Sequence, residues 1–229
     1  MIGRLRGGAG RAILVCCLIS TAWTSLGQEP EAGTLEYLLN PADFPKGWVF
    51  YSAETGVNLE KVWQLSRDAD PRTAVLVCTG KPDGYLRTEK LYDNYELGLE
   101  WMFPNDPNGN SGILLHVSDR DMIWPKAIQV QFHRPTAGSV FPNGGAKTDN
   151  MLTEKDLAKP VGEWNTCVVT CEGGRISVVM NGKKVGEVTG CMPQRGAIAL
   201  QSEGSEIHFR KFWVRPLNAP ASESTAPTE

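Results

Sequence analysis

The chain has 229 residues, of which 41% are hydrophobic and 21% charged, a composition typical of one ordinary globular domain. Its net charge of −3 and its pI near 5.7 argue against a nucleic-acid-binding protein, which usually carries a basic patch. The 24 glycines and 15 prolines predict many turns.

Residues 1–27 have the pattern of a secretory signal peptide. Three arginines precede an apolar run at 12–23, and small residues follow at 25–27. The apolar run is too short for a stable transmembrane helix. We therefore expect cleavage after Gly27 and export to the periplasm or the extracellular space, with no membrane span in the mature protein. Retention of the segment as an anchor is the alternative.

Three further segments follow the predicted signal peptide. Residues 28–34 are polar and form a predicted flexible leader. Residues 35–217 form the predicted domain. Residues 218–229 are rich in Pro, Ala, Ser and Thr without periodicity, which predicts a disordered tail.

The mature chain keeps Cys78, Cys167, Cys171 and Cys191. An oxidising compartment permits disulfides among them, but the sequence does not give their connectivity. Cys167 and Cys171 are too far apart along one strand to pair with each other. Buried free thiols are the alternative, and the absence of a CxxC pair argues against a cysteine-ligated zinc site.

Short β-type runs separated by turns make up the predicted domain. Gly-Gly at 173–174 and Asn-Gly at 181–182 are typical of hairpins. The best helical candidate, 152–158, is only about two turns long. This pattern predicts an all-β jelly-roll sandwich of two antiparallel sheets. The predicted strands are 74–79, 85–88, 94–103, 111–117, 127–133, 164–172, 175–181, 183–188, 196–202 and 206–215.

Alternation along three of these strands predicts a polar patch. Side chains at every second position share a face, and on each strand one face is apolar and the other carries polar groups. If the strands adjoin, the polar faces combine into one patch, which suits sugar hydroxyls. A plain solvated face is the alternative. The patch would contain Glu100, His116, Gln129, Gln131 and His133.

An ordered set of segments resembles the 3-keto-disaccharide hydrolase domain family, also described as 3-keto-glucoside 1,2-lyase / 3-keto-2-hydroxy-glucal hydratase domains. The resemblance covers nearly all of the predicted domain and is similar in style to secreted members from planctomycete-like bacteria. It implies a concanavalin A-like fold, the jelly roll of lectins and glucanases. The segments are GYLRTEKLYDNYELGLEWMF (84–103), GNSGILLHV (109–117), WPKAIQVQFH (124–133), PVGEWNTCVVTCEGGRISVVMNGKKV (160–185) and GAIALQSEGSEIHFRKFWVRPL (196–217).

The chemistry that the resemblance implies is elimination followed by hydration of a 3-keto-glycoside. The ketone at C3 acidifies the C2 hydrogen, a base removes it, the C1 substituent leaves, and water adds to the enone. Such a site needs a base, a group that stabilises the enolate oxygen, and an acid for the leaving group. The catalytic candidates are Glu100, His116, Lys126 and His133.

Each candidate has a chemical reason. The two histidines titrate in the useful pH range, Glu100 could serve as base or metal ligand, and Lys126 could stabilise the enolate oxygen. A divalent metal ion is an open alternative as cofactor, although the sequence has no tight ligand spacing. The candidates for substrate binding are Asn110, Ser111, Trp124, Gln129 and Gln131.

Two positions depart from the family pattern. Many relatives carry glutamate at the position of Gln129, and other branches often carry arginine at the position of His116. Glutamine cannot act as a general acid or base, so a non-catalytic carbohydrate-binding module of the same fold is the main alternative function. An interaction domain in a surface assembly is a third. The sequence gives neither the sugar and its linkage nor the oligomeric state.

Overall fold

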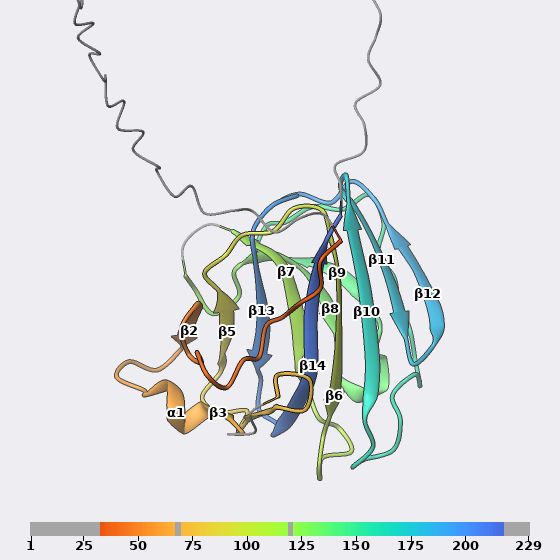
Figure 1. Cartoon of the computed structure of the whole chain (residues 1–229). Helices are drawn as coiled ribbons and strands as arrows, with labels where there is room; N and C mark the ends of the chain where they lie inside the picture. Colours follow the sequence, from red (N-terminus) through yellow and green to blue (C-terminus); the bar gives the residue numbers. More distant parts are fainter. Residues whose placement is uncertain (1–32, 67–69, 119–120, 218–229) are drawn as a thin grey trace, which may run out of the picture.

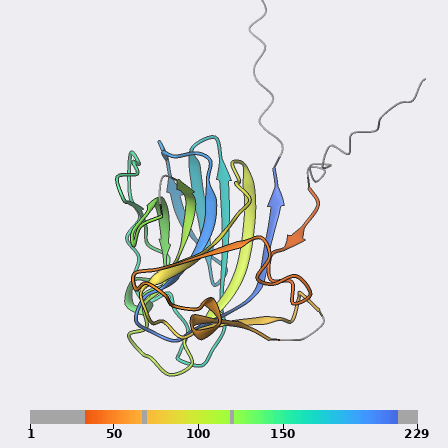
Figure 2. The ribbon, with the colours of Figure 1, turned by 90° about the vertical axis from the view of Figure 1, so that its left-hand side faces the viewer.

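The computed structural model describes residues 33–66, 70–118 and 121–217, so the predicted signal peptide and tail lie outside the described residues. Two antiparallel sheets stack face to face (Figures 1 and 2). The larger has eight strands, in the order β12 (Lys183–Val188), β11 (Arg175–Met180), β10 (Asn165–Glu172), β6 (Tyr95–Met102), β14 (Ile207–Pro216), β4 (Val75–Cys78) and β3 (Trp63–Leu65), with β1 (Glu36–Tyr37) also paired to β14. The smaller has six, in the order β2 (Trp48–Ser52), β5 (Gly84–Thr88), β13 (Ala197–Ser202), β7 (Gly112–Ser118), β8 (Lys126–Gln131) and β9 (Val140–Asn143).

Every predicted strand is present within a few residues of its expected limits, and the predicted all-β sandwich of two antiparallel sheets is confirmed. The sequence did not indicate the short strands β1, β2, β3 and β9. The predicted helix at 152–158 is wrong, because Leu152 exchanges backbone hydrogen bonds with Val140 and Asp156 has a φ of 59°, outside the right-handed helical region. The described helical segments are α1 (Leu59–Val62), capped by the Asn58 side chain, and the 3₁₀ turn η1 (Arg134–Thr136).

The core fills the space between the two sheets, as the alternation predicts. Leu97 and Trp101 on β6 are fully buried, and so are Ile128 and Val130 on β8. Trp101 stacks on Phe132 across the interface, with ring centroids 4.9 Å apart. Burial of this apolar area is the main stabilising contribution.

The four described cysteines are buried free thiols. Burial raises the pKa of Cys78 and of Cys167 to about 12, so these thiols stay protonated and unreactive at neutral pH. None of the described helices has the length and apolar character that crossing a membrane requires.

Candidate functional site

The outer face of the smaller sheet carries a glycine surrounded by amide side chains. Gly112 on β7 lies opposite Gln131 on β8, and Leu114 lies opposite Gln129. On the other side of β7, Leu200 pairs with Ile113, so the same register sets Gln201 beside Gly112. A Cβ atom at Gly112 would collide with Gln201 Oε1 and lie 3.0 Å from Gln129 Nε2. The missing side chain leaves room for these amides to approach one another.

The amides form a directional hydrogen-bond network. Asn143 Nδ2 and Gln201 Nε2 both donate to Gln129 Oε1, the second at 3.4 Å. Gln129 Nε2 donates to Gln131 Oε1 at 3.0 Å, and the Phe132 backbone N–H donates to the same oxygen at 3.2 Å. Gln129 therefore uses both ends of its amide, one as acceptor and one as donor. A carboxylate at this position has no hydrogen to donate.

Three acceptor oxygens at this end of the sheet are buried without a hydrogen-bond partner. They are Gln201 Oε1, Asn110 Oδ1 and Glu203 Oε2. The register of β13 and β7, continued past their ends, sets Glu203 beside Asn110 in the same way that Gln201 lies beside Gly112. Buried polar atoms are nearly always paired, so these three oxygens are the natural acceptors for donors that a bound ligand would supply.

Glu203 has an unusual carboxyl group. Burial, and then the negative charge of Asp83, raise the pKa of Glu203 to about 7, whereas the nearby Asn110 side chain lowers it to a smaller extent. The group therefore changes charge near neutral pH, where it can either accept or donate a proton. Asp83 is exposed, just ahead of β5.

Asp106 lies at the same end of the sheet, and its pKa is displaced in the opposite direction to that of Glu203. Ser205 Oγ donates to Asp106 Oδ2 at 2.7 Å, and the Asn108 backbone N–H donates to Oδ1 at 2.8 Å. The bond from Ser205, followed by that from Asn108, lowers the pKa of Asp106. The Asn110 backbone N–H in turn donates to Ser205 Oγ at 3.3 Å. The two carboxyl groups near Asn110 thus have pKa values displaced in opposite directions.

An aromatic pair borders the amides on the side of β2 and β5. Tyr85 is paired with Gln201 across the sheet and with Tyr51 on its other side. The two tyrosine rings stack with centroids 5.1 Å apart, and Tyr51 is half-buried. Tyr85 Oη donates to Asp121 at 2.9 Å, and burial raises the pKa of Tyr85. Tyr85 is fully buried, so of the two rings only Tyr51 can present a face to a ligand.

The structure brings several predicted residues together. Gln129 and Gln131 are neighbours on the outer face, and Asn110 lies at its end. His133 lies at the same end, because the Arg134 backbone N–H donates to Gly109 O there. One ring nitrogen of His133 is 3.1 Å from Thr136 Oγ1. Four of the predicted positions therefore lie around one surface.

Two predicted binding residues, Ser111 and Trp124, and the catalytic candidate Lys126 fit this surface less well. Ser111 is fully buried, and its hydroxyl donates to the backbone oxygen of Gln201 at 2.8 Å, so it supports β13 from beneath the outer face. Trp124 is half-buried just ahead of β8, and its stacking on a sugar stays a prediction. Lys126 is the first residue of β8 and by alternation falls on the face of Ile128, opposite to that of Gln129.

The prediction that Glu100 joins this patch is wrong. Its strand, β6, pairs with β10 and β14 in the larger sheet, so Glu100 lies on the far side of the core from Gln129. There Arg210 Nε and Lys211 Nζ donate to its two oxygens at 2.6 and 2.8 Å. These partners outweigh burial and lower the pKa of Glu100. Glu100 is thus part of a surface ion-pair cluster.

The prediction that His116 points out of the smaller sheet is also wrong. The register shifts between Leu115 and Ser118, and His116 adopts a φ of 55° within this bulge. The bulge turns the ring inward against Tyr95, with ring centroids 5.5 Å apart. The two ring nitrogens lie 3.2 Å from the backbone oxygens of Pro193 and Asp93, and burial lowers the pKa of His116.

The sequence reasoning missed Gln201, Glu203 and Asn143. Gln201 and Glu203 continue the alternation of the strand at 196–202, which was a readable signal. Asn143 belongs to β9, a strand that the sequence did not indicate. Its contact with Gln129 Oε1 could not be foreseen without that strand.

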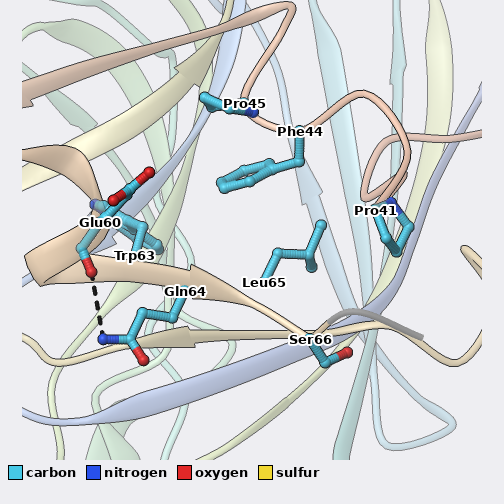
Figure 3. Close-up of a pocket in the computed structure, with 8 residues that line it drawn as sticks. All are labelled: Pro41, Phe44, Pro45, Glu60, Trp63, Gln64, Leu65 and Ser66. Atoms are coloured by element: carbon cyan, nitrogen blue, oxygen red, sulfur yellow. Dashed lines mark hydrogen bonds between the residues drawn. The ribbon is translucent and has the colours of Figure 1, made fainter. Parts of the chain in front are cut away.

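A separate cavity of about 420 Å³ lies beside α1 and β3 (Figure 3). Phe44 and Leu65 point into it, and its carboxylate comes from Glu60, whose backbone oxygen accepts from Gln64 Nε2 at 3.3 Å. Among the described residues that line it, none besides Glu60 is a carboxylate, histidine, lysine or other titratable group that could pass a proton. Across residues 33–66, 70–118 and 121–217, no group of three or more His, Cys, Asp and Glu side chains is arranged to hold a metal ion.

Comparison with known proteins agrees with this architecture. A candidate glycosyl hydrolase from Parabacteroides distasonis ATCC 8503 is 20% identical, with a TM-score of 0.60 over 81% of this chain and 94% of its own. Bacillus licheniformis β-glucanase is 12% identical, with a TM-score of 0.55 over 83% and 100%. The carbohydrate-binding module CBM66 from Bacillus subtilis is 11% identical, with a TM-score of 0.54 over 74% and 95%. At these identities the likeness concerns the fold, which is the glucanase-type jelly roll.

No curated protein sequence matches the chain significantly. Residues 35–215, however, match the 3-keto-alpha-glucoside-1,2-lyase-like domain. The match spans both sheets, including all the strands that border Gly112. The chain therefore belongs to the family of 3-keto-alpha-glucoside-1,2-lyase-like domains.

Proposed function

We propose that the protein is an exported enzyme that cleaves 3-keto-glycosides by elimination and rehydration, with the sugar bound over Gly112 on the outer face of the smaller sheet. Membership of the 3-keto-alpha-glucoside-1,2-lyase-like family supports the substrate class. The arginine-led apolar segment at the N-terminus supports export.

The buried acceptors at the end of the sheet carry the proposal. Gln201 Oε1, Asn110 Oδ1 and Glu203 Oε2 lack partners among the described residues, and sugar hydroxyl groups are donors of the right kind. Leaving one such oxygen unpaired costs about 1–3 kcal/mol, so a ligand that supplies donors gains affinity there. The half-buried Tyr51 ring, which stacks on the fully buried Tyr85, supplies an adjoining apolar surface.

The reaction requires an acidic C–H bond and a polarised ketone. The C3 ketone acidifies the hydrogen on C2, and its removal gives an enolate whose negative charge rests on the ketone oxygen. Gln131 accepts hydrogen bonds through Oε1, which leaves its Nε2 group to donate to that oxygen. Expulsion of the C1 substituent gives an enone, and addition of water then completes net hydrolysis.

An ultraviolet time course with a 3-keto-glucoside tests the proposal, because the enone absorbs where the substrate does not. We expect a transient absorbance together with release of the free aglycone. A parallel reaction with chelator decides whether a divalent ion takes part. Turnover of an ordinary glucoside without any transient would contradict the elimination route.

A non-catalytic carbohydrate-binding module is the second candidate, and one observation favours it. The network around Gln129 holds an amide, which cannot act as acid or base, at a position where the family resemblance implies glutamate. The fold is also shared with a carbohydrate-binding module. A flat ultraviolet trace on several 3-keto-glycosides, together with calorimetric binding of the same sugars, would favour the module over the enzyme.

A further inference from the structure

Glu203 differs from the other carboxylates that have displaced pKa values. Among the described residues, Asp70, Glu100, Asp106 and Asp121 have hydrogen-bonding partners that lower their pKa. Glu203 has neither an arginine nor a lysine among the groups that displace its pKa. A carboxyl group kept half-buried without a cation is costly for a fold to maintain, so it calls for a function.

The position of Glu203 matches the place where a bound sugar would meet a carboxyl group. It follows directly after β13, beside Asn110 and in the same alternating row as Gln201. Its Oε2 atom is buried and lacks a partner, as are Asn110 Oδ1 and Gln201 Oε1. A ligand that donates to the two amide oxygens would therefore reach the neighbouring position, which Glu203 occupies.

We propose that Glu203 is the catalytic residue that moves the proton from the substrate carbon to the leaving oxygen. This inference rests on the function proposed above and assigns its acid–base role to a residue outside the amide network. Gln129 then needs no catalytic role, and its amide serves to hold Gln131 and Gln201 in place.

The step balances with one carboxyl group. The Glu203 carboxylate takes the proton from C2, and the electron pair of the C2–H bond passes into the enolate. When the enolate returns to the ketone, this pair forms the C1=C2 double bond. The C1–O bond breaks, and its electron pair stays on the leaving oxygen. That oxygen receives the proton from Glu203, which returns to its carboxylate form, so no external acid, base or oxidant is consumed.

The charged groups near Glu203 are compatible with this cycle. Asp83 opposes ionisation of Glu203, and the neutral Asn110 weakly favours it, so that both protonation states are accessible near pH 7. Asp106 is tied to Ser205 and Asn108, and His133 and Arg134 contribute to keeping it ionised. Asp106 thus remains an anion through the same range in which Glu203 changes charge.

The test compares Glu203→Gln with Glu206→Gln in the mature protein, using the ultraviolet and aglycone assays. Glu206 lies on the same connection, is exposed and bonds His208 Nε2 at 2.7 Å, so it is a matched control. We expect Glu203→Gln to lose on the order of 10²–10⁴-fold in kcat with little change in sugar affinity, and Glu206→Gln to keep its activity. Wild-type activity that survives Glu203→Gln would overturn the inference while leaving the proposed function intact.

A second variant tests the role without removing the carboxyl group. The wild-type kcat/KM should rise with pH through an apparent pKa near 7, the range to which burial and Asp83 bring Glu203. Asp83→Asn removes the neighbouring negative charge. The rise of kcat/KM should therefore occur at lower pH, by roughly half a unit. An unchanged pH profile of kcat/KM in Asp83→Asn would contradict the assignment of Glu203. Absence of any turnover by the wild type would instead refute the proposed function.

Discussion

Replacing Gln129 by glutamate tests whether the amide network requires a glutamine. Gln129 is 4% exposed, donates to Gln131 Oε1 and accepts from Asn143 and Gln201. A glutamate keeps the two accepted bonds but turns the donated bond into a contact between two oxygens. Gln131 cannot simply rotate its amide, because its Oε1 also accepts from the Phe132 backbone N–H.

The size of the stability loss in Gln129→Glu follows from these contacts. Loss of one buried hydrogen bond with an acceptor left unpaired costs about 1–3 kcal/mol, and the buried charge adds to this. At pH 7.5 we expect Gln129→Glu to lower the free energy of unfolding by about 2–3 kcal/mol. For a domain of 150–250 residues that corresponds to a fall in Tm of roughly 4–12 °C.

The pH dependence gives the sharper result. Burial raises the pKa of a glutamate at this position above its unfolded value of about 4.3. The protonated form can donate to Gln131, so the variant should match the wild type near pH 4 and lose stability as pH rises through the raised pKa. Thermal unfolding at several pH values measures the difference in Tm between the wild type and Gln129→Glu. Gln194→Glu, at an exposed position, is the control. A difference in Tm that is absent, or that stays constant with pH, would refute the reasoning.

Two further predictions concern Gly112 and His116. Gly112→Ala should lower sugar affinity more than tenfold, measured by calorimetry, because its Cβ would lie 3.0 Å from the Val130 backbone oxygen and collide with Gln201 Oε1; unchanged affinity would place the sugar elsewhere. Since burial lowers the pKa of His116, its contribution to stability should be lost as pH falls through its unfolded pKa of about 6.5. The Tm gap between wild type and His116→Asn, a residue that tolerates the φ of 55°, should therefore shrink from pH 7.5 to pH 5, and a constant gap would contradict this role.

Alternation predicted the faces of individual strands because successive side chains point to opposite sides of a sheet. It was right for Leu97 and Trp101 on β6 and for Ile128 and Val130 on β8. It failed at His116, where a bulge adds one residue to β7 and reverses the side-chain direction. Nothing in the composition of that strand marks the bulge in advance.

The neighbours of each strand were harder to predict than the strand itself. The chain passes from β6 in the larger sheet directly to β7 in the smaller one, so Glu100 and Gln129 end on opposite sides of the core despite their closeness in sequence. The pairing of β13 with β7 joins residues far apart in the chain. That pairing creates the site around Gly112, and Glu203 was overlooked because its surroundings in the sequence resemble a turn.

The course of β14 sets how the domain can be attached to other molecules. Its ten residues span about 33 Å, beginning shortly after Glu203. At its other end the Gly33 backbone N–H donates to Pro216 O at 3.3 Å, so both ends of the described chain leave the domain together (Figure 1). A fusion partner, affinity tag or solid support joined directly at Gly33 or Leu217 would therefore be attached a full strand length from Glu203, away from the proposed sugar-facing surface.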